Sequence, residues 1–145
     1  KELSFRHIDA GNLARARELG DEAIETVRGI SPHDPQLGWM YSEIGCNELK
    51  MKNVTRALEL ASQGIAMLES TDDSYAWHRS MARYRRAVVL HRMGRDDDAR
   101  NDLDVALRTM ANPAIATRDR TLGQPPLDEL DRELRALAAS RNGAR

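Results

Sequence analysis

The chain has 145 residues, which is enough for one domain with a real hydrophobic core. Its formal net charge is −1, with 31% charged and 4% aromatic residues, so neither contact with nucleic acid nor an anionic membrane partner is expected. No apolar run approaches the ~18 residues of a membrane-inserted helix, and the single cysteine excludes an intrachain disulfide, which fits a reducing compartment such as the cytoplasm.

Helical segments separated by short polar turns are predicted along most of the chain. Residues 1–9 look like the later part of a helix, and the chain does not begin with Met, so we expect an excised piece of a longer protein. Asn12, Asp34 and Asn53 can cap the helices that follow them, because their side-chain oxygens accept hydrogen bonds from exposed backbone N–H groups, and Pro35 suits a first helical position. Helices are therefore predicted over 13–27, 35–51, 54–68, 74–93 and 96–110, with Gly29 and Ser31-Pro32 ending the first of these.

The last two of these helices are predicted to form a tight antiparallel hairpin. Gly94 ends the first helix, because glycine enters the left-handed conformation without a steric penalty. Three aspartates, at 96, 97 and 98, suit the positive end of the next helix. Small residues at facing positions, such as Ala87, Ala99 and Ala106, allow the two helix backbones to approach closely.

The same pattern occurs twice more upstream. Ala57 lies 42 residues before Ala99, and Ala16 lies 41 residues before Ala57. In this alignment Gly45 coincides with Ala87, and Leu107 coincides with Ile65. Near-equal periods of this length indicate stacked helical repeats.

The chain resembles the tetratricopeptide repeat family in these repeats. The residues that match the family's pattern are Tyr41, Ile44, Gly45, Ala57 and Ala61 in the middle repeat, and Ala87, Leu90, Gly94, Ala99 and Leu103 in the third. Glu48 stands where the family has tyrosine, Arg83 and Arg86 fill the aromatic and leucine positions, and the period exceeds the family's ~34 residues. The resemblance implies an all-α solenoid of helical hairpins, a right-handed superhelix of about three repeats over residues 1–110. Other solenoids of helix pairs remain open.

The pattern changes after residue 110. Residues 111–126 contain three prolines and read as a linker. Residues 127–145 contain a predicted helix with a leucine stripe at 127, 130, 134 and 137. This helix either caps the open end of the repeats, as such arrays require, or docks in the concave groove of the same or a neighbouring molecule.

Nothing in the sequence indicates a reaction centre, a metal site or a cofactor site. The four histidines, at 7, 33, 78 and 91, are scattered, and no phosphate loop or nucleophile motif is present. Cys46 is interpreted as a packing or groove residue, and the three consecutive aspartates as a helix start. We therefore expect no enzyme activity and no cofactor.

A stripe of arginines at 79, 83 and 86 lies on one face of the predicted helix over 74–93. Guanidinium groups in such a stripe could hold a phosphate or a peptide carboxylate. The alternative, which we favour, is that they pair with acidic side chains of neighbouring helices while their stems cover apolar surface.

The resemblance implies that the first helix of each hairpin lines a concave groove that binds a peptide or helix of a protein partner. The positions that this assigns to partner binding are Phe5, Trp39, Ser42, Cys46, Leu49, Trp77, Met81, Tyr84, Arg85, Val88, His91 and Arg92. Both tryptophans of the chain fall on this face, where aromatic side chains are good anchors, although they could instead fill contacts between helices.

Three functional hypotheses follow. The leading one is a non-enzymatic protein-protein interaction module within a larger scaffold, secretion or signalling protein. The second is a sensor or effector domain of a bacterial transcription regulator or signalling enzyme. The third is a structural role in which the repeats form a homo-oligomer.

Overall fold

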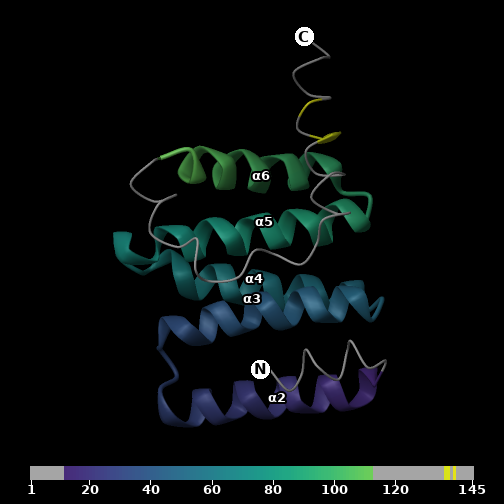
Figure 1. Cartoon of the computed structure of the whole chain (residues 1–145), viewed down its shortest axis with the longest axis vertical. Coiled ribbons are helices and arrows are strands. Elements are labelled where there is room, and N and C mark those ends of the chain that lie inside the picture. The colour runs from purple at the N-terminus through teal and green to yellow at the C-terminus, as the bar shows by residue number, and fades with distance from the viewer. Residues whose placement is uncertain (1–11, 113–135, 138, 140–145) are drawn as a thin grey trace. The chain divides into compact units, whose positions relative to one another are not determined.

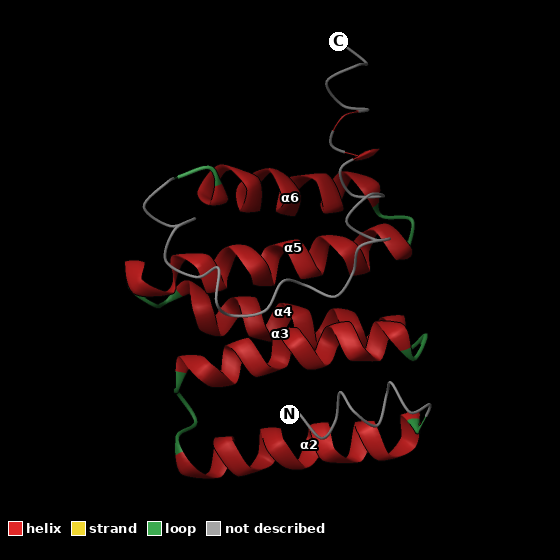
Figure 2. Cartoon of the chain, viewed as in Figure 1, coloured by secondary structure: helices red, strands yellow, loops and turns green. Residues whose placement is uncertain are grey.

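The computed structural model describes residues 12–112 together with residues 136, 137 and 139. The complete elements in this part of the chain are α2 (Leu13–Ile30), α3 (Pro35–Lys50), α4 (Val54–Glu69), the 3₁₀ helix η1 (Asp73–Tyr75), α5 (Ala76–Arg92) and α6 (Asp96–Met110). Residues 12–112 contain no strand (Figure 2). The predicted all-α fold class is confirmed, whereas the helix predicted over 1–9, the linker over 113–126 and most of 127–145 lie outside the described residues.

The predicted caps are present at three helix starts. The side chains of Asn12, Asp34 and Asn53 accept hydrogen bonds from backbone N–H groups two or three residues further on, at 3.0, 2.8 and 3.4 Å. Pro35 occupies the first position of α3, where its missing N–H costs nothing. Local sequence therefore sets where α2, α3 and α4 begin.

Two helix boundaries differ from the prediction. Gly29 and Ser31-Pro32 were predicted to end α2. Gly29 lies within the last turn, whereas Ser31 is the C-cap, and its N–H closes the helix on the carbonyl of Val27 at 2.8 Å. The helix predicted over 74–93 is preceded by η1, because the Asp72 carboxylate accepts from the N–H of Ser74 at 2.9 Å and caps a separate turn.

The turns that follow α3 and α5 have the same geometry. Gly94 adopts a positive φ of 76°, and the N–H of Arg95 bonds to the carbonyl of Leu90 at 2.9 Å. At the end of α3 the equivalent residue is Lys52, with a φ of 63°, in a region that favours glycine. The repeat thus preserves the turn although it does not preserve the glycine.

The close approach of α3 and α4 depends on glycines. A Cβ atom on Gly64 would lie 2.6 Å from the carbonyl oxygen of Gly38 and 3.0 Å from the backbone nitrogen of Ser42. A Cβ on Gly45 would lie 3.0 Å from the carbonyl oxygen of Ala57. These contacts are with backbone atoms, so the two helices can keep this separation only while these positions lack side chains. The α5 and α6 pair uses alanines instead, and Ala87, Ala99 and Ala106 are fully buried.

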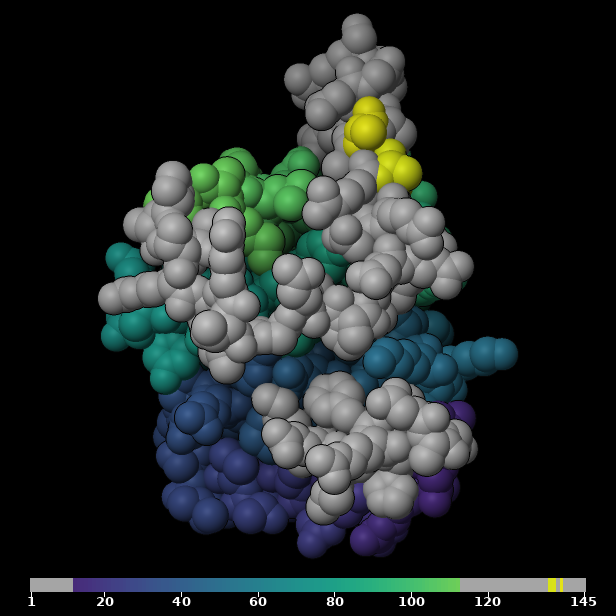
Figure 3. Space-filling model, in the orientation of Figure 1, coloured from purple at the N-terminus to yellow at the C-terminus, as the bar shows by residue number. Residues whose placement is uncertain are grey.

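The helices fall into two units that divide between Thr71 and Asp72. The first contains α2, α3 and α4, and its core cluster is formed by Ile24, Leu37, Tyr41, Ile44 and Leu60. The second contains η1, α5 and α6, with Ala82, Val89 and Leu103 among its buried residues. In Figure 1 α5 and α6 lie side by side, in agreement with their extensive contacts, and side chains of α6 reach the surface in Figure 3.

Candidate partner-binding faces

Four residues of α3 that were predicted to line a groove, Trp39, Ser42, Cys46 and Leu49, belong to the first unit, and we call them the groove face of α3. Other sides of α3 are used for packing, since its core residues contact α2 and its glycines contact α4. Ser42 and Cys46 are buried, with 0% and 8% exposure, whereas Trp39 and Leu49 are half-buried. The accessible part of this face is therefore the tryptophan and the leucine. Phe5, which was assigned to the same surface, lies outside the described residues.

The groove face of α5 belongs to the second unit and consists of Trp77, Met81, Tyr84, Arg85, Val88, His91 and Arg92. Four of its side chains, at positions 81, 84, 85 and 88, are at most 7% exposed. Trp77 and His91 are half-buried and Arg92 is exposed. The Trp77 ring meets the His78 ring edge-on with centroids 5.3 Å apart, and Nδ1 of His91 lies 2.8 Å from Oδ1 of Asp96. The accessible groups thus lie toward the two ends of α5.

The arginine stripe of α5 pairs with acidic groups. Arg86 donates from Nε and Nη2 to the two carboxylate oxygens of Asp102 on α6, at 2.6 and 2.9 Å. Arg83 donates to the same carboxylate at 3.1 Å, and Arg79 donates to the Asp72 carbonyl at 2.7 Å. The prediction that these arginines pair with acidic side chains of a neighbouring helix is confirmed for Arg83 and Arg86.

The ionic cluster of Arg83, Arg86 and Asp102 occupies positions that are apolar in the first unit. Forty-two residues earlier in the chain, the equivalent positions hold Tyr41, Ile44 and Leu60, which belong to the core cluster. At these equivalent positions the first unit therefore has apolar packing, whereas the second has an ionic cluster.

A second buried ion pair was missed by the sequence analysis. The Glu48 side chain is fully buried and accepts from Nε and Nη2 of Arg17 on α2 at 3.0 and 2.9 Å. Asn53 donates to the same carboxylate at 3.1 Å, and Arg56 approaches it at 3.3 Å. The hydrogen bonds from Arg17 to Glu48 raise the pKa of Arg17, so this guanidinium stays protonated. A glutamate at the position where the family has tyrosine could have indicated a buried charge at Glu48, but no pattern in the sequence identified Arg17 as its partner.

No metal-binding cluster is found among the described residues. In residues 12–112, 136, 137 and 139, no group of three or more His, Cys, Asp or Glu side chains is arranged to hold a metal ion. The three aspartates at the start of α6 pair separately, Asp96 with His91, Asp97 with Arg100 and Asp98 with Arg95. Cys46 is a buried free thiol. None of the helices described is long and apolar enough to cross a membrane.

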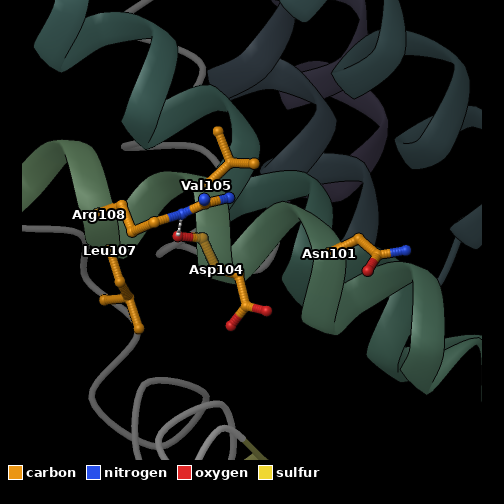
Figure 4. A pocket seen from close by; sticks show the side chains of 5 residues that line it. All are labelled: Asn101, Asp104, Val105, Leu107 and Arg108. Atoms are coloured by element: carbon orange, nitrogen blue, oxygen red, sulfur yellow. Dashed lines mark hydrogen bonds between the residues drawn. The ribbon is translucent and has the colours of Figure 1, made fainter.

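An open hollow lies on α6 that the sequence analysis did not predict. It has a volume of about 590 Å³ and is lined by Asn101, Asp104, Val105, Leu107 and Arg108 (Figure 4). Nε of Arg108 donates to the Asp104 carbonyl at 3.2 Å, as the dashed line in Figure 4 shows.

The described residues thus form an all-α fold of helical hairpins whose small residues recur with a period of 41 to 42 residues. No family model matches the sequence, and no curated protein matches it. Solved structures do match.

The fold is similar to that of SycD, a type III secretion translocator chaperone of Yersinia enterocolitica. One SycD structure superposes with a TM-score of 0.59 at 16% sequence identity, covering 97% of this chain and 79% of SycD. A structure of SycD in complex with a peptide of the translocator YopD gives a TM-score of 0.60 at 16% identity, covering 97% of this chain and 88% of that one. Both structures are of the same chaperone, and at this identity the likeness establishes the fold alone.

Proposed function

We propose that the chain is a non-enzymatic protein-interaction module that binds a peptide or helix of a protein partner through the groove faces of α3 and α5. The observation that carries the proposal is the placement of Trp39 and Trp77. Both are half-buried on these faces, while the core cluster of the first unit is built mainly from aliphatic side chains. Large aromatic side chains held at a surface by their neighbours give contact area at little cost in ordering, which is why they anchor interfaces.

The chemistry of the two faces favours a partner segment with apolar anchors. Trp39 and Leu49 provide apolar contact area on α3. On α5, the exposed Arg92 adds a positive charge near the end of the helix. An apolar residue followed by an acidic one would therefore suit the α5 face.

The similarity to SycD supports both the proposed peptide binding and a role in secretion. SycD has been solved with a translocator peptide bound, so a fold of this kind accommodates a peptide. Among scaffold, secretion and signalling roles, this similarity favours a chaperone-like role in secretion. The buried free thiol of Cys46 fits the reducing cytoplasm.

The test selects peptides from a random library on the immobilised chain and then measures their affinity for variants by titration. Trp39→Ala and Trp77→Ala are each expected to weaken binding at least tenfold, or about 1.4 kcal/mol, because a truncated anchor loses its buried contacts. These two are better probes than Tyr84→Ala, since Tyr84 is only 5% exposed and its truncation would unfold the protein rather than report on binding.

The control is Ile30→Ala. Ile30 is the most exposed large apolar side chain described, at 81%, and it lies at the end of α2 and belongs to neither groove face as defined above. Its truncation should leave the affinity unchanged, whereas equal losses in all three variants would indicate general adhesion to apolar surface. Wild-type affinity in both tryptophan variants, with their helical circular dichroism intact, would contradict the proposal.

A further inference from the structure

Two lysines at the end of α3 differ from the other cations of the first unit. The arginines of residues 12–71, at positions 15, 17, 28 and 56, are all ion-paired with carboxylates. Lys50 and Lys52 are exposed, and neither forms an ion pair with any residue that the structure describes. We call these two residues the basic end of α3. Their positive charges are accessible to a group outside the fold.

Lys52 holds its charge at a conformational cost. Its φ of 63° lies in the left-handed region, and the equivalent residue in the second unit is Gly94. The turn is fixed because the N–H of Asn53 bonds to the carbonyl of Glu48, across Lys52, at 2.9 Å. A side chain in this conformation disfavours folding by about tenfold, whereas a cation near a helix C-terminus gains only about two- to fivefold from the helix dipole. Helix stability alone therefore does not account for the lysine.

The basic end continues the groove face of α3. Lys50 follows Trp39 by eleven residues, which is close to three helical turns, so the two side chains lie on the same side of the helix, about 16 Å apart along its axis. Leu49, directly before the basic end, is half-buried and belongs to the groove face. This side of α3 thus presents apolar contact area that ends in two positive charges.

We propose that the basic end of α3 binds an acidic side chain of the same partner segment whose apolar residue contacts Trp39. The inference rests on the proposed peptide binding and specifies the chemistry of the partner. The acidic residue would lie about 16 Å beyond the apolar anchor, which is about five residues of an extended peptide or eleven of a helix. A carboxylate there meets complementary charge, and this contact is the reason for a lysine in a strained turn.

The second unit has only half of this site. Arg92 is equivalent to Lys50 and is also exposed, but Gly94 stands in place of Lys52 and carries no charge. The preference for an acidic group should therefore be stronger in the first unit. The comparison also supplies a variant, because Lys52→Gly gives the first unit the same turn residue as the second and leaves the positive φ without strain.

The experiment selects peptides from a random library on the wild-type chain at low ionic strength. Aspartate and glutamate should be enriched relative to the unselected library, and selection on the Lys50→Gln/Lys52→Gly double variant should lose this enrichment. In titrations with the selected acidic peptides, Lys50→Gln and Lys52→Gly should each bind about two- to fivefold more weakly, as expected for exposed ion pairs. High salt should abolish the difference, because it screens exposed charges.

Three comparisons separate binding from folding and from net charge. Lys52→Gly should weaken binding while raising the urea midpoint of unfolding, a combination that a purely structural lysine would not give. Lys52→Arg keeps the charge and should retain the affinity. Arg108→Gln is the matched control, since Arg108 is an exposed cation in the last turn of α6 and belongs to neither groove face. It should leave the affinity unchanged.

Selected peptides without acidic enrichment would overturn the proposal, as would wild-type affinity in both lysine variants. An equal loss in Arg108→Gln would also overturn it, because attraction by net charge alone would then explain the binding. Wild-type affinity in both Trp39→Ala and Trp77→Ala contradicts the peptide binding itself. The failure of the basic end as a site is therefore distinguishable from the failure of the groove faces.

Discussion

Gly64→Ala should destabilise the first unit, although alanine is the better helix former. In an open helical position, replacing glycine by alanine stabilises by about 0.5–1 kcal/mol. At Gly64 the added Cβ would lie 2.6 Å from the Gly38 carbonyl oxygen and 3.0 Å from the Ser42 nitrogen, both on the backbone of α3. Neither atom can move without shifting the helix, so α3 and α4 must separate. Overpacking of this kind costs about 1–3 kcal/mol, and we expect a net loss of about 2 kcal/mol in the free energy of unfolding.

Gly29→Ala is the matched control in the same unit. Gly29 lies in the last turn of α2, and a Cβ there would meet nothing within 4 Å. The same substitution should therefore stabilise by about 0.5 kcal/mol. Urea unfolding followed by far-UV circular dichroism would measure both, and midpoint shifts of opposite sign are expected. Equal stabilisation in the two variants would refute the close-approach explanation of the α3 and α4 pair.

Three further predictions use other features of the structure. Lys52→Gly should stabilise the first unit by about 0.5–1 kcal/mol in the same urea assay, because glycine relieves the positive φ while adding entropy to the unfolded chain, and a lower midpoint would contradict this. Asp102→Asn should cost the second unit about 2 kcal/mol in thermal unfolding, since two partly buried arginines lose their counter-ion, and a negligible change would show that water replaces it. Hydrogen bonds from Ser74 lower the pKa of Asp72 below its ordinary 3.8. The cap of η1 should therefore be present while Asp72 is ionised and be lost as the pH falls through this lowered pKa. A pH titration of the Ser74 amide signal with a midpoint at or above 3.8 would contradict this prediction.

Features determined by local sequence could be predicted. The caps at Asn12, Asp34 and Asn53 and the turn at Gly94 depend on residues within one helical turn, and all four were predicted from the sequence and are present in the structure. The hairpins also followed from sequence, because small residues repeat where helices cross. Of the residues predicted to end α2, Ser31 is the C-cap, whereas Gly29 remains helical because a glycine in an exposed last turn can do so when the carbonyls still find partners.

Features that depend on partners distant in sequence could not be predicted. The Arg17 and Glu48 pair joins residues 31 positions apart, and many other arginines could have been chosen. Likewise, the family resemblance assigned Trp39 and Tyr84 to the groove faces of their helices, but it could not predict that one is half-buried and the other buried. Which of these residues contact a partner stays a prediction, because exposure within the fold depends on everything that packs nearby.

The order of the two hairpins along the chain matters for stability. Equivalent positions hold Tyr41, Ile44 and Leu60 in the first unit and Arg83, Arg86 and Asp102 in the second. Joined directly after α2, the α5 and α6 pair would set two guanidinium groups against Ile24, where the first unit places an aromatic ring and an isoleucine. The two hairpins are therefore not interchangeable, so an array with their order changed would be destabilised by desolvated charge even where the backbones fit.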